Sequence, residues 1–429
     1  MAIHKRLFFL LLVLLPTQLG YHFWPEWSLV LGRRIDYLSP TVYVTDLLIV
    51  CLLIAWGLAS GLRLRAFRVF IPVSIAFLIV VFAAINTFNA VNIPISVYRW
   101  IKVFEYAGLC LYIVGTKMRM RDVIFPLALS VGYSSVIGIV QFLLQHSLGG
   151  PFWLLGERSF LSDTPGIARF NICPSISYTC ALVLRAYGTF SHPNVLGGYI
   201  AVVSPIIVYH VLLSRSAYTR FYKIIIGVSF VALLMTFSRS AWTTAILHLC
   251  VVFYVALRKR EKNIWVVSRI GVVAVIGVLL TACVLFFPSV SDESVMRRID
   301  LQNAALGMWQ HSPFIGVGLG NYLVELPLYT HSRYVNFLQP VHNIFILSLA
   351  ELGIVGSFAI MIGIGFMVYR SVALFSRATI SRRLLYVIHW MPICCVLLLG
   401  FVDHYPVTLQ QGQLLSIVVL GVYVSSFLE

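Results

Sequence analysis

The sequence predicts an all-α integral membrane protein with about 12 transmembrane helices, and three observations support this fold class. Hydrophobic residues make up 60% of the 429 residues and charged residues only 11%, whereas a soluble domain carries roughly 25% charged residues. The apolar residues form continuous runs of about 20, the length that crosses a bilayer as a helix. A membrane β-barrel would show short alternating segments instead.

The apolar runs extend along the whole chain. Pro16 and Gly20 interrupt the first run. Lys5 and Arg6 precede it as in a signal peptide, but no small-residue cleavage site follows, so we interpret it as a first membrane helix. No internal repeat is visible, and we expect one polytopic domain over residues 1–429. The predicted spans are 7–30, 42–61, 69–89, 98–115, 123–146, 193–213, 222–237, 240–257, 265–287, 342–369, 384–403 and 411–428.

Basic residues between the apolar runs predict the orientation. They all fall on one side if the spans alternate, and the positive-inside rule makes that side the cytoplasm. We therefore expect both termini in the cytoplasm, and the net charge of +16 needs no nucleic-acid partner. The basic residues are Lys5, Arg6, Arg63, Arg65, Arg68, Lys117, Arg119, Arg121, Arg215, Arg220, Lys223, Arg370, Arg377, Arg382 and Arg383, with the run RKREK at 258–262.

Two long segments are then expected on the outer side, at 146–192 and 287–341. The second is a loop over 288–341 that contains VMRRIDLQNAALGMWQ. Its apolar residues Val295, Ile299, Leu306 and Trp309 recur at near-helical spacing, which predicts an amphipathic helix. This helix either lies on the outer membrane surface or packs on the protein, and both arrangements are compatible with the pattern.

Three polar clusters lie at the predicted outer ends of spans. LRAYGTFSHPNVLGG (184–198) contains Arg185, and its Pro193 suits the first position of a helix that Ser191 or His192 caps. MTFSRSAWT (235–243) predicts a tight turn that carries Arg239. An arginine at membrane depth is usually paired or functional, although one at the interface can also extend its head group into water.

The third cluster is LQPVHNIFILSLAELG (338–353). Pro340 again suits a first helical position, which places His342 and Asn343 in the first turn. The alternation of spans puts Arg185, Arg239 and His342 on one membrane face. Two guanidinium groups can bind a diphosphate through their planar arrays of donors, and a histidine can accept a proton near neutral pH. Such a set indicates group transfer from a lipid diphosphate.

At these residues the chain resembles the bacterial O-antigen ligase and O-antigen polymerase superfamily of membrane glycosyltransferases. The matching stretches are RAYGTFSHPNVLGGY (185–199), TFSRSAW (236–242), SPFIGVGLGNY (312–322) and PVHNIFILSLAELGIVG (340–356). They occur in the order of the family, and the large outer loop precedes the histidine. The resemblance covers positions 185–356, whereas the earlier spans match in hydrophobic character alone.

The resemblance implies a mechanism. The donor is a glycan on undecaprenyl diphosphate at the periplasmic face of the inner membrane, and an acceptor hydroxyl displaces the lipid diphosphate with inversion. Neither a metal nor another cofactor is implied. Arg185 and Arg239 would bind the diphosphate, and His342 would activate the acceptor. We also assign substrate binding to Asn194 and Asn343.

Four functions are compatible with the resemblance, and two of them differ only in the molecule that accepts the glycan. An O-antigen ligase transfers the glycan to lipid A–core, and we favour this activity because the motif set is compact and includes HN at a helix start. A polymerase uses a second lipid-linked glycan instead. A transporter of the lipid-linked glycan would need charges along a path through the membrane, and a non-catalytic scaffold would tolerate loss of His342.

Four charged residues lie in or near the early spans. Arg99 and Lys102 begin the fourth span on the outer side, where they bind diphosphate or anionic glycan or else anchor the helix at the interface. Asp46 and Glu105 lie inside spans and are expected to be buried with partners.

Two further features belong to the outer segments. Cys173 and Cys180 face an oxidising compartment, where they form a disulfide or remain thiols. The glycines of GVGLGNY (316–322) lack the βαβ context of a nucleotide loop and predict a turn near the site.

Overall fold

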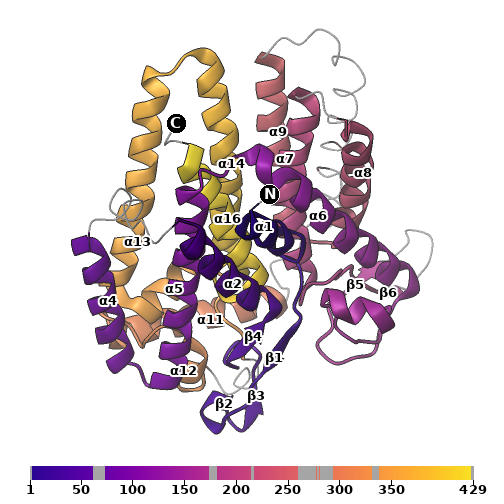
Figure 1. Cartoon of the computed structure of the whole chain (residues 1–429). Helices are drawn as coiled ribbons and strands as arrows, with labels where there is room; N and C mark the ends of the chain where they lie inside the picture. The colour runs from indigo at the N-terminus through magenta and orange to yellow at the C-terminus, as the bar shows by residue number, and fades with distance from the viewer. Residues whose placement is uncertain are drawn as a thin grey trace.

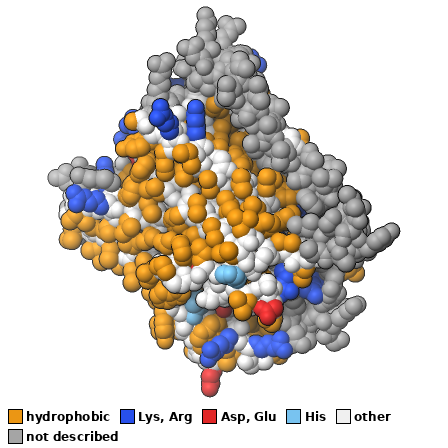
Figure 2. Space-filling model, turned by 90° about the vertical axis from the view of Figure 1, so that its right-hand side faces the viewer, with side chains coloured by type: hydrophobic (Ala, Val, Ile, Leu, Met, Phe, Trp, Pro, Cys, Tyr) orange, Lys and Arg blue, Asp and Glu red, His pale blue; other side chains and the backbone are white. Residues whose placement is uncertain are grey.

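The computed structural model describes residues 2–60, 73–172, 181–213, 217–258, 293–330 and 338–426, with the isolated positions 277 and 280. This part is mainly helical (Figure 1), which confirms the helical character of the predicted fold class, although three two-stranded sheets are also present. Figure 2 shows a broad hydrophobic belt between basic side chains at one end and mixed charged and histidine side chains at the other. The helices long and apolar enough to span a bilayer are Met120–Leu144, Pro193–Leu212, Arg239–Ala256, Ile344–Arg377 and Arg382–Val402.

The N-terminal segment differs from the predicted span 7–30. Helix α1 (Ile3–Val13) stops at Val13, and β1 (Gly20–His22) pairs antiparallel with β4 (Thr41–Tyr43). Between them lie η1 (Glu26–Ser28) and the hairpin of β2 (Leu29–Val30) and β3 (Arg33–Arg34). The span prediction was wrong here because the helix does not extend across Pro16, whose ring disfavours a helix interior.

The next helices agree with their predicted spans to within a few residues. They are α2 (Val44–Ser60), α4 (Val73–Phe88), α5 (Ile93–Gly115) and α6 (Met120–Leu144). Asn92 starts α5, because its side chain accepts a hydrogen bond from the N–H of Ile95 at 3.3 Å. A short η3 (Gly150–Leu155) and the antiparallel hairpin of β5 (Arg169–Ile172) and β6 (Ala181–Leu184) follow α6.

Helix α7 (Pro193–Leu213) lies at the centre of the main hydrophobic core. It packs against α6, α8 (Thr219–Met235), α9 (Arg239–Arg258) and α14 (Ile380–Val402). It begins at the predicted proline, and the turn between α8 and α9 covers only residues 236–238, as the sequence predicted. The C-terminal elements are α15 (Tyr405–Thr408) and α16 (Gln410–Ser426).

The amphipathic helix predicted in the second outer segment is α11 (Glu293–His311), followed by α12 (Tyr322–Tyr329). One face of α11 packs on α12 and α13 (Ile344–Arg377) and buries Leu301, Ala305 and Met308. Met296 and Ile299 are exposed on another face. Packing on the protein is thus confirmed, and contact of the exposed face with the membrane stays a prediction.

The glycine-rich stretch 316–320 is a turn that holds a break in α13. Gly353 interrupts α13 with φ 62° and ψ −168°. The N–H groups of Val317 and Gly318 donate to the carbonyls of Ala350 and Glu351, at 2.9 and 3.1 Å. The turn thereby satisfies carbonyls that the break frees, which confirms the turn and gives it a structural role in the first part of α13.

Several predictions fall outside the described residues. They are the span 265–287, the Cys173–Cys180 pair, the basic residues Arg63, Arg65, Arg68 and Arg215, and most of the basic run at 258–262.

Candidate active site

The three polar clusters meet at one end of the helix bundle. The Nε of Arg185 donates to the carbonyl of Thr236 in the α8–α9 turn at 2.6 Å. The Nδ2 of Asn343, before α13, donates to the carbonyl of Phe401 near the end of α14 at 3.2 Å. Polar residues that are distant in sequence are therefore brought together at this end of the bundle, whereas its orientation in the membrane stays a prediction.

Arg185 and Arg239 are close enough to interact electrostatically. Burial lowers the pKa of Arg185 to about 10, and repulsion by Arg239 contributes to this shift, while Tyr187 and Asp403 oppose it. Arg185 still carries its charge at neutral pH. Two buried or half-buried cations placed together favour an anion between them, because an opposite charge relieves their repulsion.

The α8–α9 turn fixes Arg239 as the first residue of α9. Phe237 adopts a positive φ of 47°, which reverses the chain. The indole of Trp242 is fully buried and donates to the carbonyl of Leu233 at 2.8 Å, which ties the start of α9 to the end of α8. The sequence TFSRSAW thus specifies a rigid turn that presents one guanidinium group.

Asn194 connects the arginine side of the site to Asp403. Its Oδ1 accepts a hydrogen bond from Nη2 of Arg185 at 2.8 Å, and its Nδ2 donates to Oδ2 of Asp403 at 3.1 Å. The side-chain amide of Asn194 therefore accepts one hydrogen bond and donates another within the protein. Sequence analysis assigned substrate binding to Asn194, and the structure places it as a link between two charged groups.

His192 caps the start of α7, as predicted. Its Nδ1 accepts a hydrogen bond from the backbone N–H of Asn194 at 3.1 Å. Burial, and then the charge of Arg185, lower the pKa of His192 to about 3. The ring is consequently neutral at physiological pH, and one of its nitrogens is used by the cap.

His342 lies just before α13, so the prediction that it belongs to the first helical turn was wrong. The helix begins at Ile344, because the side chain of Asn343 caps it by accepting from the N–H groups of Phe345 and Ile346, at 2.9 and 3.1 Å. An asparagine cap requires extended backbone, and the predicted start at Pro340 did not allow for it. Asn343, assigned to substrate binding, fixes the position of its neighbour.

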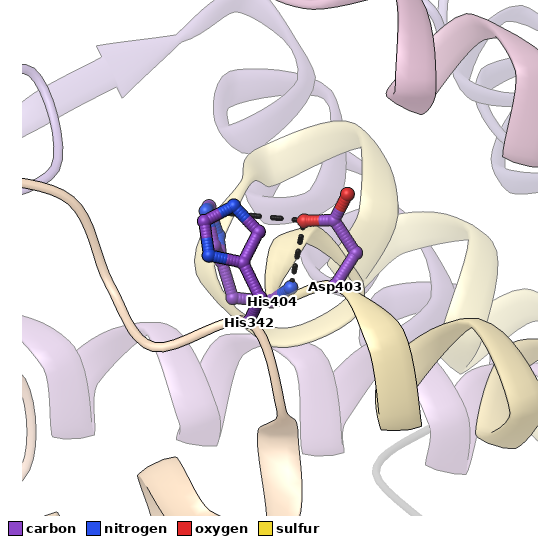
Figure 3. A group of neighbouring side chains, drawn as sticks. All are labelled: His342, Asp403 and His404. Carbon is purple, nitrogen blue, oxygen red and sulfur yellow. Dashed lines mark hydrogen bonds and ion pairs between the residues drawn. The ribbon is translucent and has the colours of Figure 1, made fainter. Parts of the chain in front are cut away.

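His342, Asp403 and His404 form a compact group (Figure 3). One ligand atom from each lies within 4.8 Å of the others. The rings of His342 and His404 have centroids 5.2 Å apart, and Nε2 of His404 lies 3.9 Å from Oδ1 of Asp403. The backbone N–H of His404 donates to the same carboxylate oxygen at 2.9 Å. Among the described residues, Nδ1 of His342 is buried without a hydrogen-bond partner.

The electrostatics keep the acid ionised and the histidines neutral. Burial alone would raise the pKa of Asp403, but His404, His342 and His192 together hold it below its usual value. Burial lowers the pKa of His342 although Asp403 opposes this, and Arg298 lowers it further. Burial likewise lowers the pKa of His404 to about 4. A neutral His342 next to a carboxylate can accept a proton.

Two histidines and a carboxylate are a donor set that suits Zn²⁺ or Fe²⁺. Here, however, Oδ2 of Asp403 accepts from Asn194, and Nδ1 of His404 lies 2.7 Å from Oγ1 of Thr408. Arg185 and Arg298 add positive charge close by. These hydrogen bonds leave Oδ1 of Asp403 and Nε2 of His404 available, so the neighbouring cations are the feature that disfavours a divalent ion.

Arg99 and Lys102 lie at a different part of the same end. Lys102 is buried on α5 and forms ion pairs with Asp46 and, at 3.4 Å, with Glu105. This confirms that both acids are partnered. Arg99 donates through Nη2 to the carbonyl of Tyr37. Both cations line a polar cavity of about 510 Å³ that also reaches His192.

Sequence reasoning missed Asp403, His404 and Arg298. The sequence signal was FVDHYP (401–406), where an acid and a histidine precede a proline at the end of a predicted span. Arg298 lies on α11, and its Nη1 donates to the carbonyl of Val402 at 3.4 Å. The contact of Arg298 with Val402 spans 104 residues and that of Asp403 with Asn194 spans 209, separations that hide both contacts from the sequence.

The fold and the site define a multi-pass membrane protein with two arginines and a histidine–aspartate group at one end of its helices. Residues 224–361 match a family model, Wzy_C, whose description is O-antigen ligase. This part of the chain is similar to the O-antigen ligase domain family, whose members are O-antigen ligase or polymerase enzymes. The match includes Arg239, the glycine turn and His342. A search of curated proteins gave no match.

Proposed function

We propose that the protein is an inverting, metal-independent glycosyltransferase at the periplasmic face of the bacterial inner membrane. It moves a glycan from undecaprenyl diphosphate to lipid A–core, which makes it an O-antigen ligase. The observation that carries this proposal is the connection of Arg185 through Asn194 to Asp403, in direct proximity to His342. These contacts fix the position of Arg185 relative to the candidate base, His342. We call Arg185 and Arg239 together the cationic clamp.

The arginine pair holds the diphosphate of the donor. Arg185 and Arg239 repel each other across a partly buried site, and a diphosphate between them relieves that repulsion. As the bond to the anomeric carbon breaks, negative charge grows on the leaving oxygen. Preorganised donors that meet this charge stabilise the transition state more than the ground state.

His342 takes the proton of the acceptor. The acceptor oxygen forms a bond to the anomeric carbon from the face opposite the diphosphate, the carbon–oxygen bond to the diphosphate breaks, and the hydroxyl proton moves to the imidazole. Nδ1 of His342 has no partner among the described residues, and its lowered pKa leaves the ring unprotonated at neutral pH. A diphosphate leaves as a stable anion, so no general acid is required.

Asp403 supports both halves of the site. Its charge stabilises the imidazolium that forms on His342, as its upward effect on the pKa of that histidine indicates. Its other oxygen holds Asn194, which orients Arg185. We accordingly treat Asn194 and Asn343 as positioning residues, and Arg99 and Lys102 as residues of the adjoining polar cavity.

The membrane arrangement belongs to the same proposal. We infer one polytopic domain with about twelve spans, cytoplasmic termini, and a periplasmic loop at 288–341 that contributes α11. The proximity of Arg298 on α11 to His342 and His404 supports the participation of this loop in the site.

Reconstitution tests the function and the choice of acceptor. The purified protein in proteoliposomes is given a glycan on undecaprenyl diphosphate together with lipid A–core, and the products are analysed by mass spectrometry. Transfer to lipid A–core supports a ligase. Extension of a second lipid-linked glycan in its place identifies a polymerase, and loss of donor from the outer leaflet without a covalent product identifies a transporter.

Variants test the residue roles. His342→Ala and Arg239→Ala are expected to abolish transfer while the protein still inserts and folds, and Arg185→Ala is expected to weaken binding of undecaprenyl diphosphate. Wild-type rates in the folded His342→Ala protein contradict the base assignment. An unchanged donor affinity in Arg185→Ala contradicts the clamp.

A further inference from the structure

Two cavities meet next to the histidines and differ in character. The first, of about 510 Å³, is polar and is lined by the N-terminal hairpin, the start of α5, η3 and the start of α16. The second, of about 360 Å³, is a largely apolar groove between α5, α13, α14 and α16. Tyr37, Arg99, Thr408 and Gln413 line both of them, so the two cavities are direct neighbours.

The polar cavity has the lining of a saccharide site. Its walls carry five glutamines and four large aromatic rings, Tyr37, Tyr43, Tyr98 and Trp153. Amide side chains offer both donors and acceptors to sugar hydroxyls, and aromatic rings supply flat apolar contacts with a polar edge.

The apolar groove has the lining of a lipid site. Its walls include Val103 on α5, Ile360 and Ile364 on α13, and Leu397 on α14. Val103 and Ile360 are partly exposed, so the groove opens on the side that the hydrophobic belt surrounds. Pro340, Ile344 and Phe345, which flank His342 in the sequence, lie at its inner end.

Both cavities adjoin the residues around His404, and the polar cavity also reaches His192, which lies close to Arg185. His404 contacts Tyr37 through ring centroids 5.4 Å apart and lies 2.7 Å from Thr408, which lines both cavities. In the other direction the path runs from Asp403 through Asn194 to Arg185. Arg185 and Arg239 line neither cavity. An inverting displacement requires donor and acceptor on opposite faces of the anomeric carbon, and an acceptor in these cavities would be bound by residues other than the arginine pair.

We infer that the polar cavity and the apolar groove together form the acceptor site, in which the core saccharide of lipid A–core occupies the cavity and an acyl chain occupies the groove. This inference rests on the proposed function. The junction of the two cavities offers one cation, Arg99, and its Nη2 already donates to a backbone carbonyl. A tail attached through uncharged ester or amide groups fits this junction better than a second lipid diphosphate, which would need a pair of cations like Arg185 and Arg239.

The test measures equilibrium binding to the full-length protein in nanodiscs, with purified lipid A–core and with its deacylated saccharide as probes and no donor present. Val103→Trp and Ile360→Trp fill the groove. Each is expected to weaken binding of lipid A–core about tenfold, because a few methylene groups lose their apolar contacts. Affinity for the deacylated saccharide and for undecaprenyl diphosphate should stay within about twofold.

Matched controls place the same side chain on the same helices but away from the groove. Ile101→Trp on α5 and Ile362→Trp on α13 alter exposed residues that line neither cavity, and wild-type binding is expected for both. Gln339→Ala, in the polar cavity, is expected to weaken both acceptor probes equally.

The outcomes separate this inference from the proposed function. Unchanged binding of lipid A–core by the groove variants overturns the inference, and so does weakened binding of undecaprenyl diphosphate, which would assign the groove to the donor tail. Wild-type affinity for a second lipid-linked glycan but none for lipid A–core overturns it as well. Glycan transfer by the wild type is measured separately. Active transfer together with unchanged acceptor binding in the groove variants contradicts only the acceptor site, whereas absence of transfer contradicts the proposed function.

Discussion

Asn194 and Asp403 are joined by a hydrogen bond of 3.1 Å between Nδ2 and Oδ2, although 209 residues separate them along the chain. The same amide accepts from Arg185 at 2.8 Å. Asn194 begins α7 and Asp403 follows α14, two helices that pack against each other in the core. The packing of these helices therefore determines where the guanidinium group of Arg185 points relative to His342.

We predict that Asn194→Leu impairs transfer without unfolding the protein. The substitution keeps the branched shape of the side chain but removes both hydrogen bonds, each of which involves a charged group and is worth about 1.5–3 kcal/mol. The expected result is a 10- to 100-fold loss in kcat/KM, together with weaker binding of undecaprenyl diphosphate. Steady-state transfer and donor titration measure these two effects.

Asn194→Asp is the informative companion to Asn194→Leu. It keeps an acceptor for Arg185 but places a second carboxylate against Asp403, so it should restore donor binding more than it restores the rate. Equal and nearly wild-type behaviour of both variants contradicts the positioning role.

A second prediction concerns the chemistry of the clamp. Arg185→Lys and Arg239→Lys keep the positive charge and lose the planar array of donors that matches phosphate oxygens. We expect at least tenfold weaker binding of undecaprenyl diphosphate for each, and a much smaller effect on undecaprenyl monophosphate. If lysine restores diphosphate binding fully, charge alone accounts for the clamp.

The helices could be predicted from the sequence because membrane helices are long, apolar and separated by short polar turns. The starts of α7 and α9 followed directly from Pro193 and from the turn before Arg239. The prediction of the first span was wrong because hydrophobic content alone does not exclude short strands. Here β1 and β4 pair with each other although a long loop separates them in the sequence. The predicted start of α13 was wrong because the sequence offers two possible helix starts close together, one at Pro340 and one after Asn343.

The sequence could nominate site residues where one residue type suffices for the chemistry, as for Arg185, Arg239 and His342, and their roles stay predictions. It was not predictable where the role depends on a distant partner. Asp403 belongs to the candidate site because of its contacts with Asn194 and His342. Lys102, which was predicted to bind substrate or to anchor its helix, forms ion pairs with Asp46 and Glu105. Such contacts depend on helix packing, which one sequence does not specify.

We predict that transfer does not depend on a divalent metal, although His342, Asp403 and His404 lie close enough to bind one. The nearby arginines Arg185 and Arg298 disfavour the ion, because they add positive charge. Treatment with EDTA followed by gel filtration should leave the rate unchanged. A loss of activity that Zn²⁺ or Mn²⁺ restores contradicts this prediction.

A fourth prediction addresses stability at the break in α13. Gly316 has a φ of 76°, and a Cβ there would lie 2.4 Å from the carbonyl carbon of Glu351. Gly316→Ala should therefore lower the stability by more than the 1–3 kcal/mol typical of a strained backbone alone. Thermal unfolding in detergent measures the change. Gly365→Ala is the matched control, because it adds a methyl group within α13 where no atom lies within 4 Å.

The last prediction is a pH dependence with a defined sign. His342 must be unprotonated to accept the acceptor proton, and burial lowers its pKa below the usual 6.5. The rate should therefore be level at neutral pH and fall only as the pH drops below 6.5. Asp403 raises this pKa and Arg298 lowers it, so Asp403→Asn should move the acidic limb to lower pH and Arg298→Gln should move it to higher pH. Profiles of kcat/KM from pH 4.5 to 8.5 measure both shifts. Opposite or identical displacements in the two variants contradict His342 as the base, whereas a purely structural role for these residues would lower the rate without moving the limb.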